Sequence, residues 1–124
     1  MEEQFSRLET LIGKENLTKL QNSRVAVFGI GGVGGYTVEA LVRCGIGTID
    51  IVDSDKVAES NLNRQIYALH STIGKYKVDV AKERILDINP NIKINTYKTF
   101  YTPQTSGDFD FSQYDYIVDA IDTV

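Results

Sequence analysis

Short apolar runs alternate with longer amphipathic segments along this chain of 124 residues. Continuous apolar runs are typical of strands buried in a parallel sheet, and apolar residues at three- and four-residue spacing indicate helices. The sequence accordingly predicts strands at residues 24–29, 48–53, 92–97 and 114–120 and helices at residues 34–44 and 75–89. Residues 54–74 are predicted to form a long irregular segment. Such segments in compact domains are usually functional.

This alternation of strand and helix predicts an α/β fold with a Rossmann-like, doubly wound and mainly parallel sheet. Ahead of it, residues 4–21 predict one or two short helices. We therefore divide the chain into a helical segment at residues 1–23 and a Rossmann-like domain at residues 24–124. The last strand ends where a parallel sheet needs another helix. We expect an N-terminal fragment whose sheet is truncated after about the fourth strand.

Composition changes this picture only in what it excludes. A net charge of −4 without any run of basic residues argues against strong nonspecific binding to nucleic acid. No segment approaches the roughly 20 apolar residues of a membrane span, and the first residues lack a signal-peptide pattern. We expect a cytoplasmic protein with no membrane partner. The single cysteine, Cys44, excludes an internal disulfide, and we expect its thiol to be buried in the helix packing.

The stretch GIGGVGG follows the first predicted strand and leads into the first predicted helix. Gly29, Gly31 and Gly34 match the fingerprint G-x-G-x-x-G of nucleotide-binding folds. The first glycine permits a tight turn, the second a close approach of phosphate, and the third close packing of helix on strand. The N-terminus of that helix offers free N–H groups to the phosphate. The alternative is a glycine-rich turn without a ligand.

An acidic residue ends the second predicted strand. Asp53 lies 19 residues after Gly34, where such folds place the acid that hydrogen-bonds a ribose hydroxyl. The alternative is a carboxylate that caps the end of the strand. Asp55, two residues later, is a second candidate for the same ligand. Up to this point NAD and ATP fit the sequence equally well.

The segment SNLNRQ distinguishes these two ligands. Arg64 could clamp phosphate oxygens with its fork of donors, and Asn61 and Gln65 could supply further donors. Lys77, near the start of the second long helix, adds another cation. A triphosphate needs such cations after the ribose-binding strand, whereas a nicotinamide dehydrogenase does not. As alternatives, Arg64 could be a surface charge and Lys77 a solvated helix residue.

Two carboxylates, Asp119 and Asp122, end the last predicted strand. A carboxylate at that edge of the sheet can hold Mg²⁺ on the phosphates, although Asp122 could instead cap a following helix. Together with the glycine loop and the two cations, these residues suit nucleotidyl transfer. The cations would stabilise charge on an α-phosphate that is attacked by an oxygen nucleophile while pyrophosphate leaves.

In combination, GIGGVGG, IVDSD, SNLNRQ, GKYK and VDAID resemble the ATP-dependent activating enzymes of the ThiF type. That superfamily includes ubiquitin-activating enzymes and the adenylyltransferases of molybdopterin and thiamine biosynthesis. Within it, FSRLETLIG, NRQIYALHSTIGKYK and IVDAIDTV look like the tRNA threonylcarbamoyladenosine dehydratases. Those enzymes use ATP to cyclise threonylcarbamoyladenosine on tRNA. The resemblance runs from residue 5 to residue 124.

The resemblance implies roles for individual residues. Gly31 and Gly32 would line the ATP phosphates, Asp53 would bind the ribose and Asp122 would hold Mg²⁺. Arg7 matches an arginine that in dimeric relatives reaches into the partner's ATP site, which implies a homodimer. The candidate catalytic residues are thus Arg7, Arg64, Lys77 and Asp122. The candidate cofactor-binding residues are Gly29, Gly31, Gly32, Gly34, Asp53, Asp55, Asn61, Arg64, Gln65 and Lys77.

Three hypotheses for function follow. The first is activation of a carboxylate by adenylation with ATP and Mg²⁺, for the cyclising dehydration of threonylcarbamoyladenosine on tRNA. The second is an adenylyltransferase that activates the C-terminus of a ubiquitin-like sulfur carrier and works with a sulfur-transfer partner. The third is a nucleotide-binding module without catalysis. An NAD-dependent oxidoreductase is disfavoured by Arg64, Lys77 and Asp122.

Overall fold

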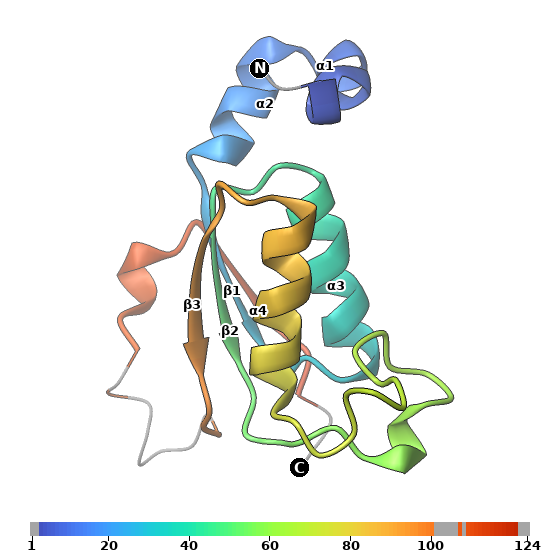
Figure 1. Cartoon of the computed structure of the whole chain (residues 1–124). Helices are drawn as coiled ribbons and strands as arrows, with labels where there is room; N and C mark the ends of the chain where they lie inside the picture. Colours follow the sequence, from blue (N-terminus) through green and yellow to red (C-terminus); the bar gives the residue numbers. More distant parts are fainter. Residues whose placement is uncertain (1–2, 101–106, 108, 122–124) are drawn as a thin grey trace.

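A parallel sheet forms the centre of the structure, a computed structural model that describes residues 3–100, 107 and 109–121 (Figure 1). In these residues the sheet has four strands, in the order β3, β2, β1, β4. The strands are β1 (Arg24–Phe28), β2 (Thr48–Val52), β3 (Lys93–Tyr97) and β4 (Tyr116–Asp119). The predicted Rossmann-like α/β fold is confirmed.

The strand order creates a switch point between β1 and β4. From β1 the chain moves outward to β2 and β3, and it then returns to pair β4 with the other side of β1. Phe28 is in register with both Val52 and Asp119, so the three strands end level with one another. The residues that follow them therefore meet at one edge, where open α/β sheets bind their ligands.

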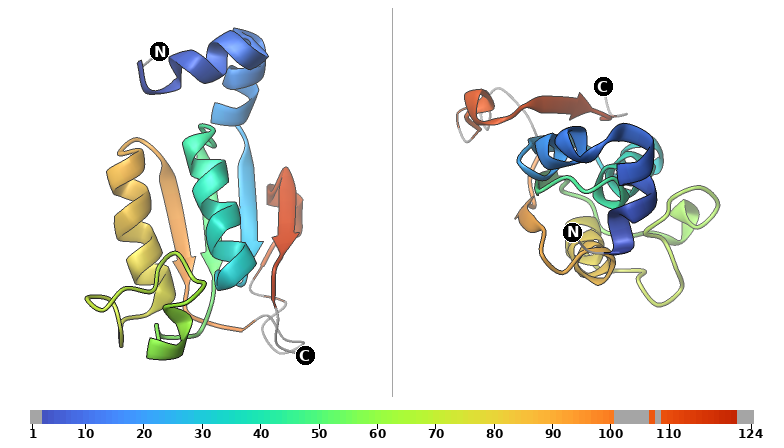
Figure 2. Two further views of the ribbon diagram at one scale, coloured as in Figure 1. Left: turned by 90° about the vertical axis from the view of Figure 1, so that its right-hand side faces the viewer. Right: turned by 90° about the horizontal axis from the view of Figure 1, so that it is seen from above.

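Two helices, α3 (Gly32–Arg43) and α4 (Lys77–Ile88), cover one face of the sheet (Figures 1 and 2). Their apolar stripes pack on alternate residues of β1 and β2, because successive side chains of a strand point to opposite faces. The buried residues of this core are Val25, Val27, Ile30, Val38, Val42, Ile46, Ile49, Ile51, Tyr67, Val78, Ala81, Ile85 and Ile92.

Both helices begin away from their predicted first residues. Helix α3 begins two residues early, at Gly32 inside the glycine loop, and α4 begins two residues late, at Lys77. The late start has a local cause. Tyr76 has extended backbone and forms an antiparallel bridge with Lys56, so the chain is still strand-like at this point. The irregular segment before α4 contains one short 3-10 helix, η2 (Glu59–Asn61), among its described residues.

The second face of the sheet carries a smaller, aromatic cluster. Ala26, Phe28 and Val52 pack there against Phe109, whose ring meets that of Phe28 edge-on with centroids 5.2 Å apart. The connection from β3 to β4 therefore returns across this face. In its described residues the connection contains a 3-10 helix, η4 (Phe111–Gln113), and no α-helix.

A carboxylate is fully buried in the middle of this second face. Asp50, on β2, accepts hydrogen bonds from Nε and Nη2 of Arg24 at 3.1 and 2.7 Å. Asn95 of β3 donates a third hydrogen bond at 3.0 Å, and the Tyr114 hydroxyl donates a fourth at 2.7 Å. These partners come from β1, β3 and the connection to β4, so one charge ties four segments together.

The N-terminal residues form η1 (Glu3–Phe5), α1 (Ser6–Ile12) and α2 (Lys14–Gln21), which lie at the amino ends of the strands (Figure 2). Phe5 and Leu17 are buried there beside Gly45: a Cβ on Gly45 would lie 3.4 Å from Leu17 Cδ1 and 3.5 Å from Phe5 Cε1. The prediction of one or two short helices at residues 4–21 is confirmed, with two α-helices observed there. This helical segment and the switch point occupy opposite ends of the sheet (Figure 1).

The prediction for Cys44 is wrong, because its side chain is exposed. Cys44 is the C-cap of α3, and Gly45 turns the chain away with a φ of 90°. The residue thus falls on the turn and not on the packing face of the helix. As to the membrane, none of the helices in the described ranges has the length and apolar character needed to cross a bilayer.

The stabilities of two variants, with alanine at either of two nearby glycines, test the packing of α3. A Cβ on Gly34 would lie 1.7 Å from the carbonyl oxygen of Gly29, whereas a Cβ on Gly32 meets no atom within 4 Å. We expect Gly34→Ala to lower the free energy of unfolding by about 3 kcal/mol or more, because backbone cannot yield like a side chain. The matched Gly32→Ala variant should unfold like the wild type in urea. Equal stabilities of the two variants would contradict this packing.

The pH dependence of the stability lost in an Asp50→Asn variant tests the lowered pKa of the buried carboxylate. Burial alone would raise the pKa of Asp50, but the hydrogen bonds from Arg24, Asn95 and Tyr114 outweigh it and hold that pKa below its usual value. A depressed pKa stabilises the fold above the unfolded value of about 3.9, and this stability is lost as the pH falls through the folded pKa. We expect Asp50→Asn to lower the free energy of unfolding by about 2–3 kcal/mol at pH 7.

The penalty for Asp50→Asn should shrink below about pH 4, because the carboxyl group then takes up a proton in the unfolded wild type while the folded state, with its lower pKa, still holds Asp50 charged. Urea denaturation at a series of pH values measures it. Asp87→Asn, at an exposed position of α4, is the control and should change stability little at any pH. A penalty for Asp50→Asn that is the same at pH 7 and pH 3 would mean that folding does not lower the pKa of Asp50.

Candidate functional site

A cavity lies at the carboxyl edge of the sheet, beside the switch point between β1 and β4. It brings together residues from the glycine loop, the end of β2, the irregular segment and the start of α4. The predicted site residues that line it are Gly29, Gly31, Asp53, Asp55, Asn61, Arg64, Gln65 and Lys77. The residues that the sequence analysis missed are Phe28, Val52, Ser54, Thr99, Phe100, Ala120 and Ile121.

The glycine loop forms one wall of this cavity. Gly29 has a φ of 86°, and a Cβ there would lie 2.8 Å from the carbonyl oxygen of Ala120. Gly31 is the N-cap of α3 and makes no side-chain capping bond, so the N–H groups of the first helical turn are open to an anion. Gly32 and Gly34 do not line the cavity; Gly34 has the packing role that the fingerprint predicts.

Asp53 connects the end of β2 to the turn after β1. Its Oδ2 accepts a hydrogen bond from the N–H of Ile30 at 2.9 Å, and its Oδ1 accepts one from the N–H of Asp55 at 2.8 Å. Both oxygens are thereby oriented by backbone. Each keeps a second lone pair that can accept a hydroxyl of a ligand, as the prediction of a ribose-binding acid requires.

Lys77 is the first residue of α4 and brings its charge into the cavity. Its side chain is only 7% exposed, so the alternative of a solvated helix lysine is wrong. Among the described residues its ammonium has one ion pair, with Oδ2 of the exposed Asp55 at 3.9 Å. A buried ammonium with so distant a counter-ion is suited to a second anion, because burying a charge is costly unless it is paired.

Arg64 lies at the mouth of the cavity. It is exposed, yet its guanidinium is held locally: Nη1 donates to the carbonyl oxygen of Ser60 at 3.1 Å and to Oδ1 of Asn63 at 3.0 Å. Arginine carries five N–H donors in a planar fork, so several remain for a ligand. A surface position and a phosphate-binding role are therefore compatible at this residue.

Two buried amides stand between these cations and the glycine loop. Asn61 lines the cavity and uses its Oδ1 to accept a hydrogen bond from the N–H of Ala58 at 2.8 Å, and its Nδ2 can act as a donor. Gln65 places its Nε2 3.2 Å from the point where a Gly31 Cβ would be. A side chain at position 31 would therefore push Gln65 aside, so the glycine keeps this amide close to the loop.

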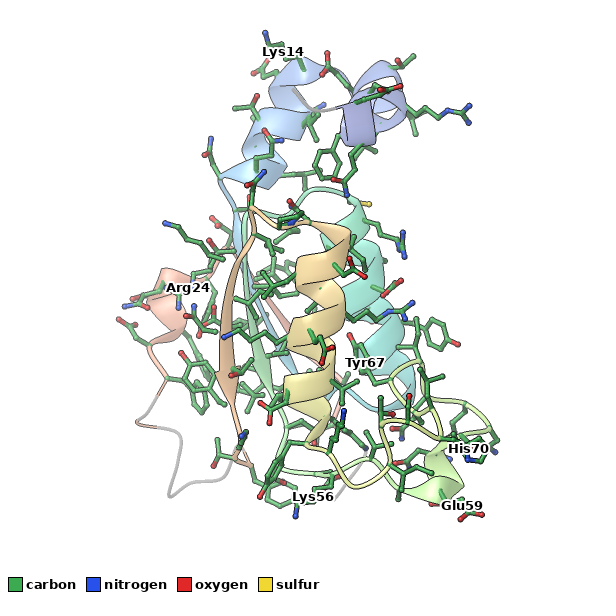
Figure 3. All side chains as sticks on the ribbon, viewed as in Figure 1. Lys14, Arg24, Lys56, Glu59, Tyr67 and His70 are labelled. Atoms are coloured by element: carbon green, nitrogen blue, oxygen red, sulfur yellow. The ribbon has the colours of Figure 1, made fainter. Side chains whose placement is uncertain are left out.

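Tyr67 anchors the irregular segment that carries these residues. It points from the segment toward α3 (Figure 3), where it is buried and its hydroxyl donates to the carbonyl oxygen of Gly35 at 3.5 Å. Burial raises the pKa of Tyr67, so it stays a neutral phenol. The segment is thus fixed to the same helix whose first turn borders the cavity.

The residues that were missed are neighbours of predicted ones in the sheet. Phe28 and Val52 are the last residues of β1 and β2, Thr99 and Phe100 follow β3, and Ala120 and Ile121 follow β4. The rule that the carboxyl ends of parallel strands share an edge could have found them. Ser54, between two predicted acids, has no motif of its own that marks it as a site residue.

Besides Gly32 and Gly34, one predicted residue within the described ranges, Arg7, does not line the cavity. Arg7 is exposed on α1, at the end of the sheet far from the switch point (Figure 1). Asp122 lies outside the described residues, so its metal role is untested. Within the described ranges, no group of three or more acidic, histidine or cysteine side chains is arranged to hold a metal ion.

Known proteins are similar to this chain in sequence. The sequence matches the ThiF family over residues 5–124. It is 52% identical over 121 residues to the tRNA threonylcarbamoyladenosine dehydratase of Bacillus subtilis, covering 98% of this chain and 48% of that protein. It is 40% identical over 111 residues to the probable adenylyltransferase/sulfurtransferase MoeZ of Mycobacterium tuberculosis, covering 90% of this chain and 28% of that protein.

Solved structures extend the similarity to three dimensions. The tRNA N6-threonylcarbamoyladenosine dehydratase of Escherichia coli in complex with ATP is 40% identical and superposes with a TM-score of 0.94, covering 98% of this chain and 50% of that one. A complex of that enzyme with AMP superposes equally well. The chain spans about half the length of these dehydratases. Because the family match extends over all but the first four residues, the chain belongs to the ThiF family.

Proposed function

We propose that this chain carries the ATP-binding part of an enzyme that activates a carboxylate by adenylation. The observation that carries the proposal is the buried Lys77 ammonium, whose recorded ion pair within the described residues is as long as 3.9 Å. It faces a cavity that also holds Arg64 and the glycine loop. Phosphates would supply the missing negative charge. The E. coli relative was solved with ATP and with AMP, which supports this choice of ligand.

Different lining residues contact different parts of the nucleotide. Asp53 accepts the ribose hydroxyls, and Gly31 receives phosphate together with the first turn of α3, which begins at Gly32. Arg64 and Lys77 stabilise the negative charge that develops on the α-phosphate during transfer. Asn61 and Gln65 add neutral donors beside them, and Asp55 holds the Lys77 side chain in place. This concentration of cations favours ATP over NAD.

The carboxylate that we propose as the substrate is that of threonylcarbamoyladenosine in tRNA. The support is the identity of 52% to a protein named as the dehydratase of that nucleoside. ATP would convert the carboxylate to an acyl-adenylate with release of pyrophosphate, and internal attack on its carbonyl carbon would cyclise the modification with AMP as the leaving group, so that the nucleoside loses one water overall. Residues 24–124 would then be part of the adenylation domain of a longer protein. A cytoplasmic location fits this substrate.

Two further parts of the proposal concern groups away from the cavity. Asp122 would hold Mg²⁺ beside the phosphates, because it follows β4 at the edge where the cavity lies. Arg7 would act in a partner subunit of a homodimer. This role is supported by its exposure on α1, at the end of the sheet opposite its own chain's cavity.

A second candidate is an adenylyltransferase for a ubiquitin-like sulfur carrier, with a sulfur-transfer partner. The identity of 40% to a probable adenylyltransferase/sulfurtransferase favours it. The cavity chemistry is the same for both candidates, since both activate a carboxylate. They differ in the acceptor, which is a modified nucleoside in one and a protein C-terminus in the other.

Loss of the two cations tests the ATP site. We expect Arg64→Ala and Lys77→Met, in the complete gene product, to weaken Mg-ATP binding by about 1.5–3 kcal/mol each, because each removes a charge-assisted bond to phosphate. Calorimetric titration measures this, with NADH titrated in parallel. Lys82→Ala, an exposed lysine of α4, is the matched control and should bind ATP normally.

Unchanged ATP affinity in both variants would remove these cations from the site, and binding of NADH in place of ATP would overturn the proposal. The acceptor is tested separately with the wild type. Incubation with ATP and tRNA that carries threonylcarbamoyladenosine should give the cyclised nucleoside with loss of 18 mass units, the mass of one water. ATP consumption that instead depends on a ubiquitin-like carrier would select the second candidate.

Mixing two inactive variants tests the role of Arg7. If Arg7 completes the partner's site, Arg7→Ala and Lys77→Met should each be inactive as homodimers. A mixed dimer would have one intact site, because the Lys77→Met subunit donates its Arg7 to the subunit that keeps Lys77. Statistical mixing should therefore restore about a quarter of the wild-type activity. Mixing that restores nothing, with mixed dimers confirmed by mass spectrometry, would exclude action across the interface.

A further inference from the structure

Ser54 lines the cavity and carries a hydroxyl for which the described residues offer no hydrogen-bond partner. It lies between Asp53 and Asp55 and lines the cavity with them. Its Oγ is buried, and over the described ranges of the chain it is the one buried side-chain nitrogen or oxygen without a hydrogen-bond partner. Buried hydroxyls are normally paired, because burial without a partner destabilises the folded state.

The orphan hydroxyl is not explained by a loose turn. The N–H of Asp53 donates to the carbonyl oxygen of Tyr97 at 3.1 Å, and the N–H of Asp55 donates to Asp53 Oδ1 at 2.8 Å. The carbonyl oxygen of Asp55 accepts from the N–H of Lys77 at 3.0 Å. The backbone on both sides of Ser54 is thus hydrogen-bonded within the turn, to the end of β3 and to the start of α4. Its hydroxyl has no partner among the described residues although the turn is well bonded.

The position of Ser54 along the cavity indicates which part of a nucleotide it would meet. The phosphate-binding groups lie toward the β1 turn and the irregular segment, where Gly31, Arg64 and Gln65 line the cavity. Ser54 follows β2, which pairs with β3 on the side away from β1. The lining residues after β3 are Thr99 and Phe100. The β2–β3 side therefore offers an aromatic wall and two hydroxyls, a surface suited to a base and a sugar.

We propose that the Ser54 hydroxyl binds the adenosine part of the nucleotide directly, and that it is left unpaired in the free protein for this purpose. A hydroxyl can donate to a base nitrogen or accept from a ribose hydroxyl, so either polar edge of adenosine can complete it. This inference rests on the proposed ATP function and adds a residue that contributes affinity at the expense of stability. Groups reserved for a ligand commonly have this opposing effect.

The test is Ser54→Ala in the complete gene product, with two readouts. Calorimetric titration gives the dissociation constants of ATP and AMP, and thermal unfolding without ligand gives the midpoint temperature. We expect both dissociation constants to rise about 3- to 10-fold, because one neutral hydrogen bond is lost and the adenosine part is common to both ligands. The midpoint temperature without ligand should stay the same or rise, because an unsatisfied buried hydroxyl has been removed.

Ser71→Ala, in the exposed part of the irregular segment, is the matched control and should leave both readouts unchanged. Three results for Ser54→Ala would overturn the inference while the ATP function stands. The first is wild-type affinity for both ligands, as a hydroxyl satisfied by water would give. The second is a midpoint temperature lowered by more than about 4 °C, the sign of a structural hydroxyl. The third is weaker binding of ATP alone, which would assign the contact to the outer phosphates.

A wild-type protein that binds neither nucleotide would overturn both the inference and the proposed function. The two failures are therefore distinguishable, because only the second is visible without the variant.

Discussion

The close approach of α3 to the turn after β1 is the contact on which the site depends. With no side chain at Gly34, the helix backbone lies where a Cβ would be 1.7 Å from the Gly29 carbonyl oxygen. This distance puts the first turn of α3 at the carboxyl end of β1, so its free N–H groups face the edge of the sheet. Asp53 then hydrogen-bonds the N–H of Ile30 and fixes the end of β2 to the same turn. These two contacts position the walls of the cavity. The cations of Arg64 and Lys77 then line a cavity whose shape the backbone has set.

The second face of the sheet is organised by charge as well as by apolar burial. Asp50 lies in β2, which ends directly before Asp53, and Arg24 begins β1, which ends directly before the glycine loop. The Tyr114 hydroxyl brings the connection to β4 onto the same carboxylate. Hydrogen bonds depend on direction, whereas apolar burial does not, so this network aligns the strands that carry the site. Misalignment of β1 and β2 would separate the glycine loop from Asp53.

Features encoded by nearby residues were predictable, and those that depend on distant neighbours were not. The strands, the glycine loop and the acid after β2 follow from patterns that spacing alone reveals, and Lys77 was found because it stands near the start of a helix. Asp50, by contrast, looks like the polar residue of an ordinary strand, because its partners are 26 to 64 residues away. The late start of α4 depends on the bridge between Lys56 and Tyr76, and the exposure of Cys44 depends on where the helix ends. The unpaired state of Ser54 exists only once three backbone segments have met.

Lys77 and Ser54 show how a site can be rigid and incomplete at the same time. The backbone around both is hydrogen-bonded, and the N–H of Lys77 itself donates to the carbonyl oxygen of Asp55. Little backbone ordering therefore has to occur on binding. A preformed site gains affinity mainly because this entropic cost is reduced. Yet the ammonium and the hydroxyl lack close partners in the described structure, so the free protein bears their desolvation. A ligand that satisfies both recovers this energy, and by linkage it stabilises the fold in proportion to the logarithm of its concentration. The cost of burying these two groups and the affinity that a ligand would gain by pairing them thus have the same physical origin.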